Sequence, residues 1–312
     1  MESVFGHSIF TFLLYNNINI VARRRIIDYT QKEPNCMKKN NLIKKLQPVF
    51  LLAASAAAVC RALAVALSYG TADNYFKQGD LLSVFAVILA VCAAGCGCAA
   101  ILLDSPKKDK PSIFERASFP NPFAGGAIAA ALLFAGYRLL GVGYGSKLTT
   151  FDLVLILCLL MATAYGTISG MQNAANRQTV GAFLGLFAIL SCILLNAYYY
   201  FDTSIEMNAP LKTSIQVGLL FAMLFLTGEV RYLLGIPMPR MMQLFAVCTV
   251  SFGALSAIAV PVAFFSGKLS RPDYLAGALL VLGAIPTAII RLRTLTNPTK
   301  IASGEADSEM TE

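Results

Sequence analysis

The amino-acid sequence predicts an all-α protein, a polytopic transmembrane helical bundle of about eight spans with both termini in the cytoplasm. Hydrophobic residues make up 57% of the 312-residue chain and charged residues only 13%, about half the charged share of a soluble globular protein. The apolar residues also fall into long runs, and a helix of about 20 apolar residues crosses a hydrocarbon core of roughly 30 Å.

The lengths of these runs favour helices over barrel strands. Backbone polar groups in lipid must bond within the protein, which leaves helices or closed barrels. A barrel strand needs only about 10 residues, so the runs are too long for strands. The predicted spans are Val49–Tyr69, Leu81–Leu103, Phe123–Gly143, Phe151–Met171, Val180–Phe201, Thr213–Gly235, Met241–Phe265 and Tyr274–Leu292.

The distribution of basic residues predicts the orientation. From Met37 onward, the loops on one side of the predicted spans carry 14 Lys and Arg residues and those on the other side carry 5. Cytoplasmic loops are enriched in Lys and Arg, so the basic side is expected to be cytoplasmic. The net charge of +8 is explained by these loops, because it is not gathered on one face or helix as nucleic-acid binding requires. The predicted partner is therefore the lipid bilayer and not a nucleic acid.

Three regions follow from this pattern. We expect a cytoplasmic N-terminal segment at 1–47, the eight-helix bundle at 48–293, and a disordered acidic cytoplasmic tail at 294–312. In residues 1–36 the apolar stretch is too short to span a membrane, and its charges follow the stretch, unlike those of a signal peptide. We expect translation to begin at Met37 and residues 1–36 to be an extension.

Arg61 is the first candidate functional residue. It lies 13 residues past Pro48, roughly 20 Å into the first span by helical rise. A charged side chain at mid-bilayer costs at least ~2.5 kcal/mol unless it is paired or hydrated. The small residues Ala57 and Ala64 flank it and suit a bundle interior. Two interpretations stay open: a functional arginine, or one that snorkels to the outer interface, since Gly70 is nine residues on.

Glu229 is the second candidate. It lies six residues before Gly235, roughly 9 Å inside the cytoplasmic end of the sixth span. It continues a helical stripe that begins at Gly218, so it is expected to face a neighbouring helix. Arg231 lies two residues away and points to a different face. Two interpretations stay open: a structural ion pair with an arginine of another span or loop, or a desolvated carboxylate that exchanges protons.

The predicted outer end of the fifth span carries a third candidate region. Asn196 is followed there by Tyr198, Tyr199, Tyr200 and Asp202. Tyrosines gather at lipid–water boundaries, so an interfacial aromatic belt is one interpretation. A substrate-binding lip is the other.

One stretch of the chain carries a distinctive series of residues. These are Phe201-Asp202, Met207-Asn208, Pro210, Lys212, Met223-Leu224-Phe225 and Glu229-x-Arg231. The series resembles a recurring pattern in uncharacterised polytopic membrane proteins of anaerobic Firmicutes, and the resemblance covers about 30 of the 312 residues. It implies a bacterial cytoplasmic (inner) membrane location and brings no activity with it.

Catalytic, cofactor and metal chemistry is not expected. His7 is the only histidine, which removes histidine-dependent membrane proteolysis. The sequence has no phosphate-binding glycine loop and no dinucleotide fingerprint. Cys92 and Cys96 share a helix face but Cys98 does not, and no histidine or carboxylate lies nearby, so small apolar packing is expected rather than a metal site.

Two functions of different class remain. The first is a small secondary transporter or permease-like protein, with a cavity bordered by Arg61, Asn196 and Gln216 and with Glu229 as a substrate or coupling residue. The alternative is a non-catalytic membrane subunit or scaffold that assembles with other subunits or with itself. The candidates for ion pairs are Arg138, Arg231 and Asp202.

Overall fold

The structure is a computed structural model of the chain. It describes residues 42–70, 74–77, 80–103, 121–145, 147–170, 175–234, 236 and 238–296. The expected start at Met37, most of the N-terminal segment and the acidic tail lie outside the described residues.

Eight helices form the described part of the chain, and each is long and apolar enough to cross a membrane. The predicted fold class is therefore confirmed, and the chain is a multi-pass membrane protein. The helices are α2 (Leu42–Ser68), α3 (Leu81–Leu103), α4 (Pro122–Gly143), α5 (Thr150–Gly170), α6 (Ala175–Phe201), α7 (Pro210–Leu233), α8 (Pro239–Phe265) and α9 (Asp273–Thr296).

Three helices begin three or more residues before their predicted spans, for two physical reasons. α2 and α6 extend into the polar segments 42–47 and 175–179, because hydropathy marks only the apolar part of a helix that continues beyond the lipid. α7 begins at Pro210 rather than at Thr213. Proline is favoured at the first helical position, where its missing N–H costs nothing.

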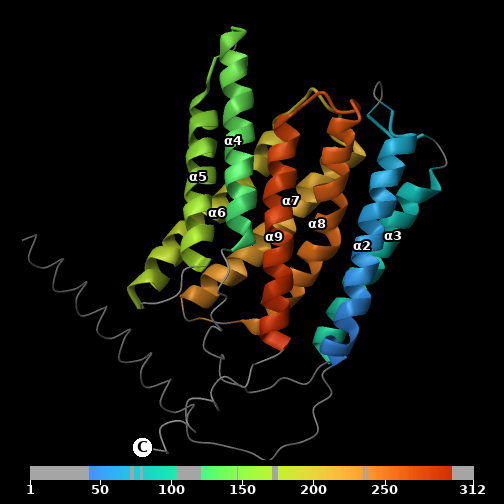
Figure 1. Ribbon diagram of the computed structural model, residues 1–312, viewed down its shortest axis with the longest axis vertical. Coiled ribbons are helices and arrows are strands. Elements are labelled where there is room, and N and C mark those ends of the chain that lie inside the picture. The colour runs from blue at the N-terminus through green and yellow to red at the C-terminus, as the bar shows by residue number, and fades with distance from the viewer. Residues whose placement is uncertain are drawn as a thin grey trace, which may run out of the picture. The chain divides into compact units, whose positions relative to one another are not determined.

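The helices form a central unit with a hairpin on either flank (Figure 1). α6, α7, α8 and α9 pack against one another. The α2–α3 hairpin packs on α8, and the α4–α5 hairpin packs on α9 and α6. Large apolar side chains on the outward faces, such as Leu52 and Leu132, remain 72% and 67% exposed, as expected where lipid is the solvent.

Small residues let these helices approach closely. A Cβ added at Gly126 of α4 would lie 2.5 Å from the carbonyl oxygen of Leu279 and 2.8 Å from the Cα of Gly283, both on α9. On the other flank, a Cβ at Gly97 of α3 would lie 2.6 Å from the side chain of Val247 on α8. Both hairpins therefore pack closely on the central unit at a glycine: α4 against the backbone of α9, and α3 against a side chain of α8.

The turns after α2, α4, α6 and α8 lie at one end of the bundle (Figure 1). The charge distribution predicts that this end faces away from the cytoplasm, and it is called the predicted outer end below. The opposite end is the predicted cytoplasmic end.

Candidate functional site

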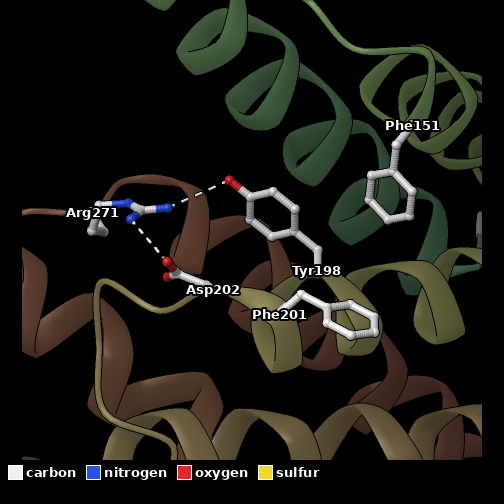
Figure 2. Close-up of a pocket in the computed structure, with 5 residues that line it drawn as sticks. All are labelled: Phe151, Tyr198, Phe201, Asp202 and Arg271. Carbon is white, nitrogen blue, oxygen red and sulfur yellow. Dashed lines mark hydrogen bonds and ion pairs between the residues drawn. The ribbon is translucent and has the colours of Figure 1, made fainter.

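Arg271, in the turn between α8 and α9, is the centre of a polar network at the predicted outer end (Figure 2). Its Nε and Nη2 donate to the carboxylate of Asp273 at 3.0 and 2.5 Å. Its Nη1 donates to Asp202 Oδ1 at 3.3 Å and to the hydroxyl of Ser204. One guanidinium thus joins the α6–α7 turn to the start of α9.

Tyrosine hydroxyls complete the hydrogen bonding of both carboxylates. Tyr198 donates to Asp273 Oδ2 at 2.8 Å, and Tyr274 donates to Asp202 Oδ2 at 3.0 Å. Tyr199 is fully buried and stacks on Tyr274 with 4.6 Å between ring centroids, whereas Tyr200 is 53% exposed. Of the three consecutive tyrosines, only Tyr200 occupies the exposed position that an interfacial belt requires.

The charges of this network stabilise one another. Burial alone would raise the pKa of Asp202, but hydrogen bonds from Ser204 and Tyr274 and the charge of Arg271 hold it below its usual value. Burial alone would lower the pKa of Arg271, but the hydrogen bonds and charge of Asp273 raise it. Asp202 and Arg271 therefore stay ionised at neutral pH.

Two pockets adjoin Arg271. The first has a volume of about 270 Å³, with aromatic walls and a charged edge formed by Asp202 and Arg271 (Figure 2). Its lining residues are Phe151, Tyr198, Phe201, Asp202 and Arg271. The second has a volume of about 200 Å³ and includes the basic residue Lys268. Arg271 lines both pockets and stands between them.

A second ion pair lies beside this network. Arg138 of α4 donates from Nη2 to Asp152 Oδ2 of α5 at 2.5 Å. The same oxygen accepts hydrogen bonds from the amide and hydroxyl of Thr149 at 2.9 and 2.7 Å. The structure thus gives partners to two of the three ion-pair candidates, Arg138 and Asp202. Arg231 is exposed, and no ion pair joins it to another of the described residues.

Glu229 lies at the predicted cytoplasmic end and is 4% exposed. It accepts two hydrogen bonds from Arg291 of α9, from Nε at 2.6 Å and from Nη2 at 2.5 Å. The guanidinium of Arg291 also lies 5.4 Å from the ring centroid of Tyr232. This is the geometry of the ion pair with another span that the sequence left open for Glu229.

The four residues predicted for substrate or coupling do not meet in one place. Arg61 bonds to Ser214 of α7, whereas Asn196 donates to the backbone oxygen of Gln216 at 3.3 Å. Arg61 and Asn196 therefore contact α7 from different helices, α2 and α6. Glu229 lies 13 residues beyond Gln216, roughly 20 Å along the helix.

Arg271, Asp273 and Lys212 were not predicted as site residues. Arg271-Pro272-Asp273 places a cation and an anion just ahead of an apolar run, and that pairing is the sequence signal that marks the site.

Two cysteines lie close together where α3 packs on α8. Cys98 of α3 faces Cys248 of α8, with 4.0 Å between the sulfur atoms. Within the described ranges, no three His, Cys, Asp or Glu residues gather closely enough to hold a metal ion. Comparisons with protein-family models, with curated proteins and with solved structures find no match to this chain.

Proposed function

We propose that the chain is a small secondary transporter of a bacterial cytoplasmic membrane that works by alternating access. The observation that supports this is the position of two ion pairs at opposite ends of α9. The outer pair joins Arg271 to Asp202, and the inner pair joins Arg291 to Glu229. Residues 273 and 291 are 18 apart, roughly 27 Å along a helix, which is close to the thickness of a hydrocarbon core.

Each pair ties α9 to a different part of the central unit. The outer pair holds it to the turn between α6 and α7, and the inner pair holds it to the end of α7. A transporter must open one end of its bundle while the other stays closed. Contacts that close each end, on the same helix, are suited to that task.

Two prolines provide places where the central helices can bend. Pro286 lies inside α9, five residues before Arg291, and Pro261 lies inside α8 near the predicted outer end. A proline inside a helix removes one backbone hydrogen bond and is the commonest cause of a kink. Movement at Pro286 would shift Arg291 relative to Glu229 without unfolding α9.

Hydrogen–deuterium exchange of the protein in nanodiscs tests this proposal without a known substrate. Glu229→Gln weakens the inner pair, so we expect faster exchange around 226–236 and slower exchange in the turns after α6 and α8. Arg271→Gln weakens the outer pair, and the reverse pattern is expected. Arg138→Gln is the control, because it breaks an ion pair that does not involve α9.

The reciprocal change at the opposite end is the decisive measurement. If each variant speeds exchange only around its own site, the two pairs are independent structural contacts and the transporter proposal fails. That outcome favours the non-catalytic membrane subunit or scaffold.

A further inference from the structure

Arg61 is a buried cation whose hydrogen-bond partners are all neutral. It is 3% exposed. Its Nη1 donates to the hydroxyl of Ser83, and its Nη2 donates to Ser214 Oγ at 3.2 Å and to the carbonyl oxygen of Pro210 at 3.4 Å. The ring centroid of Phe76 lies 4.4 Å from its guanidinium carbon. Its Nε is buried and has no hydrogen-bond partner within the described part of the chain.

Among the described residues, no carboxylate forms an ion pair with Arg61. Asp80 is close enough to interact with it electrostatically. However, Asp80 Oδ1 accepts a hydrogen bond from Ser68 at 3.3 Å, and its Oδ2 is buried with no hydrogen-bond partner in the described part of the chain. By contrast, Arg138, Arg271 and Arg291 each form an ion pair with a carboxylate. A guanidinium buried without a counter-charge is costly, so Arg61 is the exception that needs an explanation.

A second buried cation flanks the same segment. Lys212, in the first turn of α7, is 1% exposed. Its ammonium group donates to the backbone oxygens of Asp202 and Ile205 at 2.5 and 3.0 Å, and none of the described carboxylates lies within ion-pair distance of it. Arg61 on α2 and Lys212 in the first turn of α7 therefore place two cations at the start of this helix. Neither forms an ion pair with a described carboxylate.

The start of α7 is itself electropositive. The helix begins at Pro210 with no acidic residue in its first turn, and Ala209 before it provides no capping side chain. The first amides of a helix have no partner within the helix, and the helix dipole adds a positive potential there. Helix starts with this combination bind anions.

We propose that Arg61 and the first turn of α7 form a binding site for an oxyanion, the carboxylate, phosphate or sulfate group of a small molecule or of a lipid. Such a group would supply the counter-charge that Arg61 lacks and could accept hydrogen bonds from two guanidinium nitrogens at once. The inference rests on the proposed function in one respect: the anion would be the transported substrate.

Phe76 covers one side of this site. The amide of Gly70 donates to the oxygen of Tyr75 at 2.8 Å, and the isolated bridge between Tyr69 and Phe76 places the Phe76 ring over Arg61. Asn74, two residues before Phe76, lines the pocket of about 200 Å³ beside Arg271.

The outer pair is connected to the same site. Asp202 binds Arg271 through its carboxylate and Lys212 through its backbone oxygen. Opening of the outer pair would therefore loosen the turn that holds Lys212 beside the start of α7. Access to the anion site and opening of the outer end would be a single movement.

Thermal unfolding of the purified protein in detergent tests the site. The probes are sodium phosphate, sulfate and succinate, each compared with sodium chloride at equal ionic strength. A bound ligand raises Tm by on the order of 5 °C when it is present at about 100 times its Kd. We expect at least one probe to do so in the wild type and in Arg231→Gln, an exposed arginine. We expect no such rise in Arg61→Gln and a smaller one in Arg61→Lys.

The unliganded variant separates a ligand site from a structural role. In chloride alone, Arg61→Gln should melt no lower than the wild type, because the substitution removes a buried charge that has no ion-pair partner among the described residues. A large loss of Tm in chloride, or an equal rise with a probe in Arg61→Gln and in the wild type, overturns the proposal.

Nanodiscs distinguish a lipid from a soluble anion. A rise in Tm with phosphatidylglycerol over phosphatidylcholine that depends on Arg61, with no response to the three salts, assigns the site to a lipid headgroup. If neither lipid nor salts shift Tm, the anion site is absent. If an anion binds but the changes in hydrogen exchange are not reciprocal, the anion site stands and the transporter proposal fails. If the changes are reciprocal but no anion binds, the transporter proposal stands and the anion site fails.

Discussion

Glu229 of α7 and Arg291 of α9 face each other through two hydrogen bonds of 2.6 and 2.5 Å, with side chains only 5% and 16% exposed. Two parallel bonds between a carboxylate and a guanidinium form the strongest geometry available to such a pair. Because both groups are withdrawn from water, neither can be rehydrated when its partner is lost. The pair is therefore stable as a unit and costly to break on one side.

This predicts a strongly non-additive double-mutant cycle. Arg291→Met or Glu229→Leu alone should lower the free energy of unfolding by about 3–5 kcal/mol, because each leaves one buried charge uncompensated. The double variant should recover most of that loss. The measurement is reversible unfolding in mixed detergent, with Arg231→Gln as an exposed control expected to change stability by no more than about 0.5 kcal/mol. Single variants whose effects simply add would contradict the buried pair.

The outer pair predicts a specific acid dependence. The pKa of Asp202 is lower in the folded protein than its usual value because hydrogen bonds and Arg271 outweigh burial. A carboxyl shifted in this direction adds stability above its unfolded pKa, about 3.9, and loses it as the pH falls through the folded value. The difference in Tm between wild type and Asp202→Asn should therefore stay constant from pH 7 to 5 and shrink below about pH 4.

Met207, 50% exposed in the same turn, supplies the control for this experiment. The difference between wild type and Met207→Leu should not change with pH, because neither side chain titrates. A gap between wild type and Asp202→Asn that is the same at pH 3 as at pH 7 would show that Asp202 is not stabilised in its ionised form.

The helices could be predicted from the sequence, whereas most of the site could not. A transmembrane helix is specified by about 20 consecutive residues, so local hydropathy found all eight. The partners of Asp202 and Glu229 lie 69 and 62 residues away. Their pairing depends on which helices pack together, and apolar spans do not encode that in one sequence.

The contacts of the three consecutive tyrosines also depend on helix packing that the sequence does not specify. Tyr198, Tyr199 and Tyr200 are alike in composition, but successive residues on a helix point about 100° apart. The first binds Asp273, the second is buried inside the bundle and the third faces outward. Only the packing of α6 against α9 decides which tyrosine has which role.

Tyr199 and Tyr200 form a matched pair for mutation. The hydroxyl of Tyr199 donates to the backbone oxygen of Asp273 at 3.0 Å and accepts the amide of Gly277 at 2.9 Å. It thus lies between two groups that would otherwise bond each other in the first turn of α9. Tyr199→Phe should lower the free energy of unfolding by about 1–2 kcal/mol, because it removes both bonds in a buried position.

Tyr200→Phe is the control for this pair, since its ring is 53% exposed, and its effect should be within about 0.5 kcal/mol. Equal melting of the two variants would mean that α9 closes its own first turn without help from Tyr199.

The neighbours Gly125 and Gly126 predict opposite responses to the same substitution. A Cβ at Gly126 would lie 2.5 Å from the backbone oxygen of Leu279 and 2.8 Å from the Cα of Gly283, and backbone cannot move aside as a side chain can. Gly126→Ala should therefore force α4 away from α9 and lower the free energy of unfolding by about 1–3 kcal/mol.

Gly125 is the control, because a Cβ there meets nothing within 4 Å. Gly125→Ala should be neutral or stabilising by up to about 1 kcal/mol, because alanine restricts the unfolded chain and favours the helix. Unfolding of both variants in the same detergent checks the prediction, and a destabilised Gly125→Ala beside a neutral Gly126→Ala would place the α4–α9 contact on the wrong face of α4.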